Sequence, residues 1–137
     1  MKDIEELAKQ TINCGFRIHK ELGPGLLESV CEAVLAASLE RDGLRIQRQK
    51  PITIEFDGLT IADGFRADLV VEDRLIIEVK SVERTAPVHA KQLLTYLRLT
   101  GQPLGLLMNF GCETFREGLK RVVNGPSNFV PARPRPV

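Results

Sequence analysis

Three charged residues, Asp68, Glu78 and Lys80, interrupt two runs of alternating apolar residues. Glu78 and Lys80 are two positions apart in the run 75–80, so in a β-strand their side chains point to the same face of the sheet. If residues 72–74 form the turn between this strand and the preceding one, Asp68 lies directly opposite Glu78. The spacing therefore predicts two carboxylates and an amine on one patch of a sheet.

Opposed residues on neighbouring strands have Cβ atoms only ~5 Å apart, and two carboxylates that close repel each other unless a cation lies between them. Carboxylate and carbonyl oxygens are the hard ligands that Mg²⁺ prefers. Lys80 beside them is placed to orient an attacking water and favour its deprotonation, which predicts a site that cleaves phosphodiesters. The alternative is an ion pair, in which Lys80 neutralises Asp68 or Glu78 at the edge of the sheet.

Two helices are predicted before this patch. Apolar residues at spacings of three and four predict an amphipathic helix over 3–22. Gly23-Pro24-Gly25 stops it, because proline disfavours helix at the residue before it. A second helix is predicted over 26–41 and ends at Asp42-Gly43. Its expected core-facing residues are Leu27, Val30, Val34, Leu35 and Ala37.

From Arg45 onward the apolar period changes to two, which predicts strands. The first ends at the turn signal Asp57-Gly58, the second runs over 59–71 and the third over 75–80. On the second strand one face is expected to hold Leu59, Ile61, Phe65, Ala67, Leu69 and Val71, with Arg66 and Asp68 opposite.

Helical spacing returns over 87–100, a continuous apolar run over 103–110 predicts a strand covered on both faces, and a last helix is predicted over 113–124. This order is typical of an α/β domain with a mixed sheet. We expect one domain over residues 1–125, followed by a Pro/Arg-rich tail over 126–137 that frays.

Four short motifs and the acidic patch follow one another along the chain. The motifs are GLLESVC at 25–31, FRADL at 65–69, QLLTYL at 92–97 and GLLMNFG at 105–111, and nine residues separate Asp68 from Glu78-Val79-Lys80. Up to about Asn124 the chain resembles the PD-(D/E)XK nuclease superfamily, and most closely its GxxExxY branch. The resemblance implies a restriction-endonuclease-like core, αβββαβ with a mixed sheet flanked by helices. It also implies a metal-dependent nuclease that hydrolyses nucleic acid phosphodiester bonds.

The resemblance assigns roles to individual residues. Asp68 and Glu78 resemble the acids that bind Mg²⁺ or Mn²⁺, and Val79 would lend its backbone carbonyl to the ion. Lys80 resembles the catalytic lysine. Glu28 resembles an additional catalytic acid that some branches bring to the metal or its waters, and the alternative for it is a solvated residue on the second helix.

Residues on the helix over 87–100 are also implicated. Gln92 and Tyr96 resemble a Gln-x-x-x-Tyr pair of repair exonucleases in the superfamily, so Gln92 is expected to be catalytic and Tyr96 to bind substrate. They share one helix face with His89, a third candidate, one turn earlier. Together they would hold substrate phosphate or order the metal's waters. The alternative for Tyr96 is a boundary position, with its ring buried and its hydroxyl in water.

Cys31 stands where the GxxExxY branch has its name-giving Tyr. A thiol lacks the ring and the strong hydroxyl donor, so a substrate contact at Cys31 is a weaker expectation and loss of activity is an open alternative. Cys31 is a poor nucleophile because neither His19 nor His89 is near it in sequence, and a catalytic thiol needs an activating base. His19 could approach the site, although a histidine at a helix end more commonly interacts with the last carbonyls.

Composition sets the remaining expectations. An acidic start and the absence of any long apolar run predict a cytoplasmic protein without a membrane segment. Three scattered cysteines argue against a disulfide framework or a structural zinc site. The net charge is +1, divided as −3 over residues 1–44 and +4 over 45–137, so long-range attraction of nucleic acid is weak.

The expected partner is nucleic acid, most simply DNA, and a homodimer is possible. One alternative is a catalytically inactive nuclease-fold module that binds nucleic acid or regulates another protein, since fold does not fix function. Another is a subunit that joins a second chain through an exposed sheet edge or the first helix.

Overall fold

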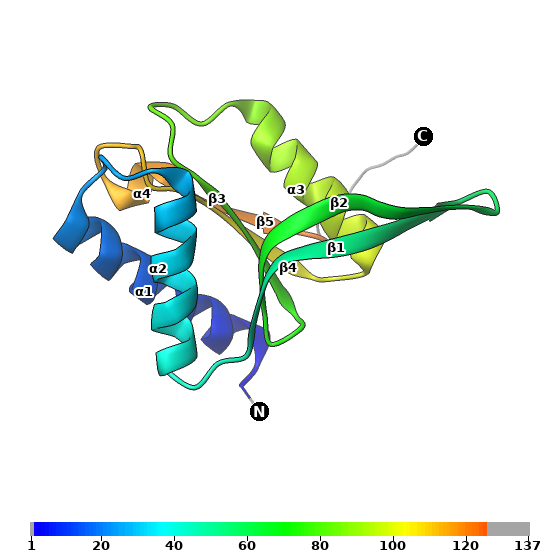
Figure 1. The fold of residues 1–137 in the computed structure, drawn as a ribbon, viewed down its shortest axis with the longest axis horizontal. Coiled ribbons are helices and arrows are strands. Elements are labelled where there is room, and N and C mark those ends of the chain that lie inside the picture. Colours follow the sequence, from blue (N-terminus) through cyan, green and yellow to red (C-terminus); the bar gives the residue numbers. More distant parts are fainter. Residues whose placement is uncertain (1, 126–137) are drawn as a thin grey trace.

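The computed structural model describes residues 2–125, in which a mixed five-stranded sheet carries helices on both faces (Figure 1). The strands are β1 (Ile46–Phe56), β2 (Leu59–Val71), β3 (Leu75–Lys80), β4 (Leu104–Asn109) and β5 (Leu119–Val123). The helices are α1 (Ile4–Leu22), α2 (Glu28–Arg41), α3 (Pro87–Thr100) and α4 (Phe115–Gly118). The strands lie side by side in chain order, and every neighbouring pair is antiparallel except β3 and β4, which are parallel.

This architecture confirms the predicted α/β fold with a mixed sheet flanked by helices. None of the helices over residues 2–125 is long and apolar enough to cross a membrane. The tail predicted over 126–137 lies outside the described residues.

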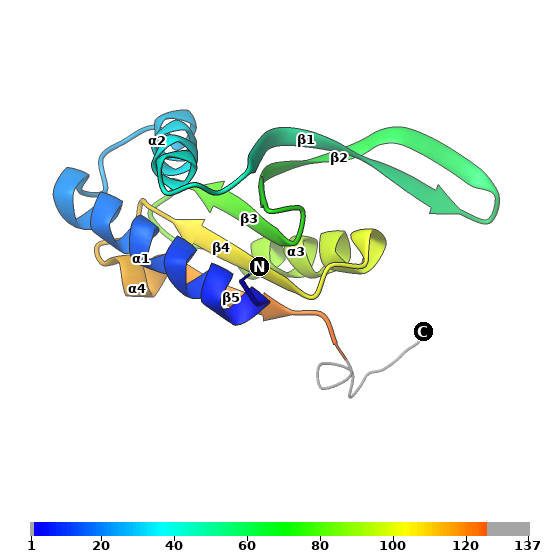
Figure 2. The ribbon, with the colours of Figure 1, turned by 90° about the horizontal axis from the view of Figure 1, so that it is seen from below.

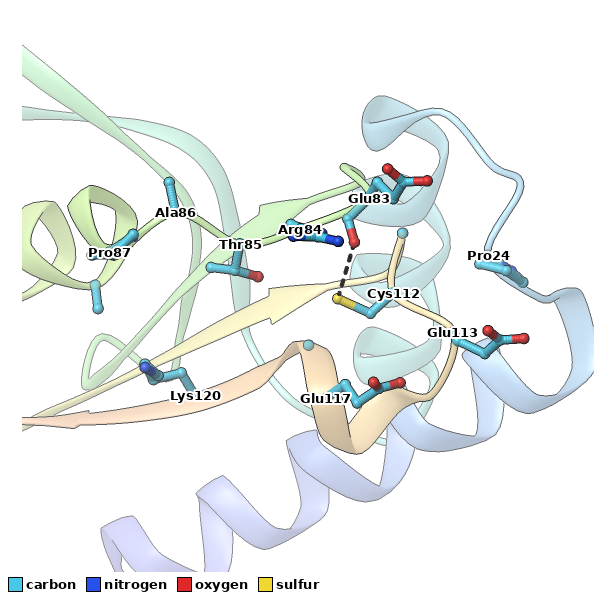
Figure 3. A pocket seen from close by; sticks show the side chains of 13 residues that line it. Pro24, Glu83, Arg84, Thr85, Ala86, Pro87, Cys112, Glu113, Glu117 and Lys120 are labelled. Carbon is cyan, nitrogen blue, oxygen red and sulfur yellow. Dashed lines mark hydrogen bonds between the residues drawn. The ribbon is translucent and has the colours of Figure 1, made fainter.

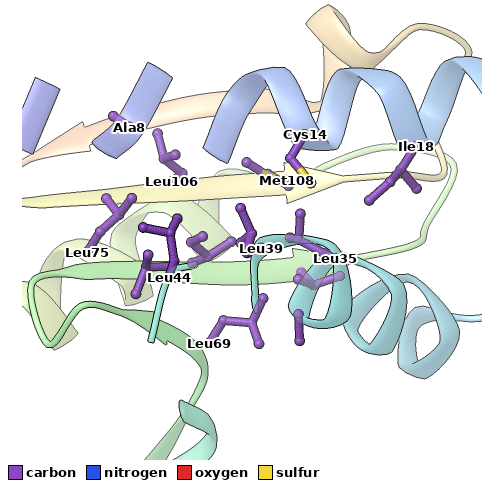
Figure 4. Packing of buried hydrophobic residues seen from close by; sticks show 14 of the residues in the cluster. Ala8, Cys14, Ile18, Leu35, Leu39, Leu44, Leu69, Leu75, Leu106 and Met108 are labelled. Carbon is purple, nitrogen blue, oxygen red and sulfur yellow. The ribbon is translucent and has the colours of Figure 1, made fainter. Parts of the chain in front are cut away.

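Helices α1 and α2 cover one face of the sheet and α3 covers the other, as Figures 1 and 2 show. The larger core cluster lies between the sheet and the first two helices, where Leu35 and Leu39 of α2 join Leu69, Leu75 and Leu106 of the strands (Figure 4). A smaller cluster packs α3 against the opposite face. Residues that alternate along a strand therefore face either the large core or α3.

Local signals set the ends of α1 as the sequence predicts. The Asp3 side chain accepts from the Glu6 backbone N–H over 2.8 Å, and the Glu6 side chain accepts from the Asp3 N–H over 3.0 Å. This reciprocal capping satisfies two of the amide donors that a helix start leaves free. At the other end Gly23 has a φ of 77°, a conformation that favours glycine.

The inward face of α2 differs from the predicted one. Leu27 is 73% exposed, Val30 is 39% exposed and Ala37 is exposed as well, so the expectation that these three face the core was wrong. Apolar residues occur all around this helix, and its sequence therefore does not single out one face. Its buried residues are Cys31, Glu32, Leu35, Ala36, Ser38 and Leu39.

The hairpin of β1 and β2 extends well beyond the rest of the sheet (Figure 1). Phe65 and Ala67 pack with the cluster under α3, whereas Leu69 and Val71 belong to the larger core. The outer residues of β2 are exposed. The prediction that these apolar residues share one face of the strand was wrong, because the strand twists as it leaves the sheet and changes the side that faces the protein.

The helix predicted over 113–124 was also wrong. Only one helical turn forms, α4, and the chain then continues as β5 along β4. A Cβ added at Gly118 would lie 2.0 Å from the Asn109 carbonyl oxygen, so glycine lets the chain pass close to β4 at the start of the new strand. Val122 and Val123 suit a strand because their β-branched side chains fit a pleated surface.

Candidate metal centre

The ladder between β2 and β3 ends one residue pair before the two predicted acids. Regular pairing stops at Leu69 and Ile77, and Asp68 and Glu78 come next. Their carboxylates take the place of the missing backbone bonds. Val79 N–H donates to Asp68 Oδ2 over 2.9 Å, and Asp68 N–H donates to Glu78 Oε2 over 3.1 Å. The two acids therefore close the gap that opens where β2 leaves β3.

The electrostatics of this gap are unfavourable to two negative charges. Burial, followed by the charge of Asp68, raises the pKa of Glu78 to about 8, well above the ordinary carboxyl value. Glu28 on α2 contributes in the same direction, and Lys80 contributes in the opposite one. A carboxylate that resists ionisation beside a second acid is stabilised by a nearby cation. The place is therefore chemically suited to a metal ion.

The donor set agrees with a hard divalent ion. Asp68 and Glu78 supply carboxylate oxygens, and Val79 adds a backbone carbonyl, since the N–H and C=O of one strand residue point to the same side. Such oxygens suit Mg²⁺, which usually keeps several waters and binds one or two carboxylates. Over residues 2–125 no group of three or more His, Cys, Asp or Glu side chains is gathered as a metal site. The acids fit a site with two carboxylates, and the charge of Glu28 contributes to the raised pKa of Glu78.

Lys80 projects from the same face of β3 as Glu78 and is half-buried. The ion pairs formed within the described part of the chain do not include Lys80. The alternative from sequence, a closed ion pair with Asp68 or Glu78, is therefore not the arrangement observed. The ammonium group lies near enough to lower the pKa of Glu78 while making no direct pair with it.

Residues of α3 approach the acids from the same face of the sheet. The ring of Tyr96 stacks on Phe65 with centroids 3.8 Å apart. Burial raises the pKa of Tyr96, and the charges of Glu78 and Asp68 raise it further, so its hydroxyl lies within the field of both acids. Gln92, one turn earlier, is exposed.

His89 has a structural contact at the start of α3. Its Nδ1 accepts from the Ala86 backbone N–H over 3.3 Å, which leaves Nε2 available for another partner. The predicted roles of Gln92, Tyr96 and His89 stay predictions; all three lie on α3, and Tyr96 is within the field of the acids.

The sequence over residues 5–122 matches the family model of the PD-(D/E)XK nuclease superfamily. The chain belongs to this superfamily. Its mixed sheet with flanking helices agrees with the restriction-endonuclease-like fold of that superfamily. PD-(D/E)XK nucleases generally use divalent metal ions.

No curated protein matches the sequence. Among solved structures, the crystal structure of SSO0001 is similar, with a TM-score of 0.43 and 17% sequence identity. The match covers 82% of this chain and 65% of that one.

Cys31 and His19, two further candidates from the sequence, are both buried. Cys31 is 1% exposed in the larger core, and burial raises the pKa of its thiol. The described structure thus offers no open thiol for the substrate contact predicted at Cys31. His19 Nε2 lies 2.8 Å from the Cys112 carbonyl oxygen, so its ring joins α1 to the loop after β4.

Two polar residues next to the acids were missed by sequence reasoning. Glu32 on α2 is only 6% exposed. Gln49 on β1 contacts both Glu32 and Asp68. A signal was present in the sequence, since the run 45–50 is polar at nearly every position although it leads into a strand.

A separate hollow of about 840 Å³ lies beyond the carboxyl ends of β3 and β4 (Figure 3). It is lined by the loop before α3, the loop before α4 and the start of β5, with both acidic and basic side chains. Asp68, Glu78 and Lys80 are not part of its wall. The hollow therefore belongs to another part of the surface than the acidic gap.

Proposed function

We propose that this protein is a metal-dependent nuclease of the GxxExxY branch that hydrolyses phosphodiester bonds in DNA. The observation that carries the proposal is the pair of Asp68 and Glu78, interlocked with each other's strands where β2 leaves β3. Burial and mutual repulsion hold the pKa of Glu78 at about 8, and Mg²⁺ or Mn²⁺ is the partner that would relieve this repulsion.

The chain's own groups divide the work as follows. Asp68, Glu78 and the Val79 carbonyl would hold the ion, which when bound stabilises negative charge on phosphate and acidifies a water. Lys80 projects from the same strand face and would orient the attacking water and favour its deprotonation. Glu28 adds an acid at the outer edge of the site and would hold a further water.

The outer residues of α3 would contact the substrate. Burial, followed by the charges of Glu78 and Asp68, raises the pKa of Tyr96 above its ordinary value, so its hydroxyl is protonated at neutral pH and would donate to a phosphate oxygen. Gln92 would donate from its side-chain amide to a phosphate of the same nucleic acid strand. His89 would use its second ring nitrogen, Nε2, for a similar contact. A homodimer would allow cleavage of both strands of a duplex, which sedimentation in the presence of duplex DNA would test.

Cleavage assays with Mg²⁺ and with Mn²⁺ test this function on single-stranded DNA, duplex DNA and RNA of equal length. We expect cleavage of DNA that EDTA abolishes. Because a metal supplies several kcal/mol of transition-state stabilisation, Asp68→Ala and Glu78→Ala should each lower the rate by roughly 1,000-fold. Glu55→Ala, which removes an exposed acid from β1, is the matched control and should leave the rate unchanged. Activity that survives both site variants would overturn the proposal.

A second candidate is a non-catalytic nuclease-fold module, and the burial of Cys31 favours it. The position where the GxxExxY branch has its Tyr is here closed inside the core. A module of this kind would remain folded without metal, would show no change in melting temperature with Mn²⁺, and would bind DNA without cutting it. Melting curves with and without Mn²⁺ therefore separate the two candidates before any substrate is chosen.

A further inference from the structure

Asp68 contacts a side chain of β1 as well as the backbone of β3. The side-chain nitrogen of Gln49 donates to Asp68 Oδ1 over 3.2 Å. The same nitrogen donates to Glu32 Oε1 over 2.8 Å. Because an amide nitrogen carries two hydrogens, a single Gln49 side chain bridges an acid of the site and a buried acid of α2.

Gln49 has an unusual backbone conformation, with a φ of 49°. Residues other than glycine seldom adopt positive φ, because the Cβ crowds the neighbouring backbone. Such a conformation persists where the surroundings fix it, and it often marks a functional site. The residues on either side of Gln49 keep their regular pairing with β2, so the distortion is confined to this one position.

Glu32 is itself held in place. Arg48 Nε donates to Glu32 Oε2 over 3.2 Å, and Gln49 occupies the other oxygen. Only 8% of the Glu32 side chain is exposed, against 48% of the Arg48 side chain. Both oxygens of Asp68 likewise have a fixed donor, Oδ1 from Gln49 and Oδ2 from the Val79 N–H.

We infer that Gln49 is a positioning residue for Asp68, with Glu32 as its anchor on α2. The inference rests on the proposed function, because it gives Asp68 the role of metal ligand. Hydrogen bonds from groups behind a ligand orient it toward the ion. A purely structural tie between α2 and β1 is already provided by Arg48 and Glu32, and it does not require the bond from Gln49 to Asp68.

Titration calorimetry with Mn²⁺ tests the inference on Gln49→Gly. Glycine adopts positive φ without strain, so this variant removes the amide while the backbone keeps its path. Loss of such a bond typically weakens metal binding by 10- to 100-fold, and we expect about 10-fold here. Glu32→Gln keeps an oxygen that can accept from Gln49 and should weaken binding less.

Gln47→Ala is the matched control, since Gln47 is an exposed glutamine of the same strand whose side chain accepts only from Lys50 in the described residues. It should bind Mn²⁺ as the wild type does. A folded Gln49→Gly protein that binds Mn²⁺ with wild-type affinity would overturn the inference.

Crystal structures of the metal-free wild type and of Gln49→Gly decide the same point without any metal. We expect the Asp68 carboxylate to turn away from the Val79 N–H, or to occupy more than one conformer, only in the variant. An unchanged Asp68 would overturn the positioning role. If the wild type binds no Mn²⁺, the proposed function fails, and this structural comparison still decides whether Gln49 orients Asp68.

Discussion

Two polar clusters near the ends of β3 and β4 differ in how completely their groups are paired. In the first, the fully buried Asn109 side chain accepts from the backbone N–H of Val82 and of Gly111, both over 3.0 Å. It donates to Thr85 Oγ1 over 2.9 Å and to Cys112 Sγ over 3.3 Å. Every donor and acceptor direction of the amide is used, and no charge is involved.

The second cluster carries an excess of negative charge. Asp68 and Glu78 face each other in the gap between β2 and β3, and the pKa of Glu78 is raised to about 8. Gln49 holds a strained backbone angle beside them. A neutral, saturated network such as that of Asn109 joins two loops and has nothing left to bind. In the acidic cluster two carboxylates repel each other, and a cation between them would relieve that repulsion.

The largest expected effect is on stability, at Asn109. Asn109→Ala would leave two backbone N–H groups without acceptors, and each unsatisfied buried group costs about 1–3 kcal/mol. We expect the free energy of unfolding to fall by about 3–5 kcal/mol in urea titrations. Thr85→Ala, which removes one partner and leaves the amide in place, should cost about 1 kcal/mol. A folded Asn109→Ala protein that keeps its stability but loses Mn²⁺ binding would contradict the division into a structural cluster and a metal-binding one.

Lys80→Ala should separate binding from chemistry within the acidic cluster. Loss of a group that assists proton transfer typically lowers the rate by 10²- to 10⁴-fold, and we expect at least about 100-fold here. Mn²⁺ affinity should change little, because Lys80 donates no ligand oxygen. Lys120→Ala, an exposed lysine on β5, is the matched control and should cleave normally. Equal losses in the two variants would show a general effect of positive charge.

The pH dependence of stability sharpens the comparison in the metal-free protein. The pKa of Glu78 is about 8 in the folded state against 4.5 ordinarily, so the folded protein holds a proton that the unfolded chain has released. The stability that this retained proton contributes is fully present below the unfolded pKa of Glu78, 4.5, and is lost as the pH rises through about 8. The unfolding free energy should therefore fall with rising pH, by at most about 1.4 kcal/mol per unit.

Urea unfolding of the wild type and Glu78→Gln across this range measures that loss as the difference between the two proteins. Relative to Glu78→Gln, the wild type should lose stability as the pH rises from about 5 through 8, and Mn²⁺ should abolish this trend. Parallel curves for the two proteins would show that Glu78 ionises in the folded state as it does in the unfolded chain.

Tyr96→Phe should have the smallest effect. The stack on Phe65 survives the change, so stability should shift by less than about 0.5 kcal/mol. Loss of one hydrogen bond to substrate costs about 0.5–1.5 kcal/mol, which corresponds to a cleavage rate lower by roughly 2- to 10-fold. An unchanged rate would favour the simpler boundary role for Tyr96, with the ring buried and the hydroxyl in water.

The acidic pair was predictable because its geometry depends on a local feature. A three-residue turn over 72–74 sets the register, and the structure pairs Val71 with Leu75 as that turn requires. Asp68 then falls opposite Glu78 without any knowledge of the rest of the fold. The helix α1 was predictable for the same reason, because its cap and its stop are neighbours in sequence.

The parts that were missed depend on distant segments. The strand β5 forms because the edge of β4 is available for pairing. Gly118, which has no Cβ, lets the chain pass close to the Asn109 carbonyl as β5 begins. The burial of Glu32 depends on how α2 packs against β1. The sequence of α2 is apolar on several sides and does not indicate which side is buried. The positive φ of Gln49 depends on partners far along the chain and has no local signature.

Mn²⁺ titration of the wild type beside the double variant Asp68→Asn/Glu78→Gln tests the central claim most directly. The variant keeps the size of both side chains and removes their charge, so it should fold and lose the repulsion that the ion would relieve. We expect binding by the wild type at neutral pH, with release of protons because Glu78 must ionise, and no binding by the variant. Equal binding by both proteins, or none by a folded wild type, would contradict the assignment of this gap as a metal centre.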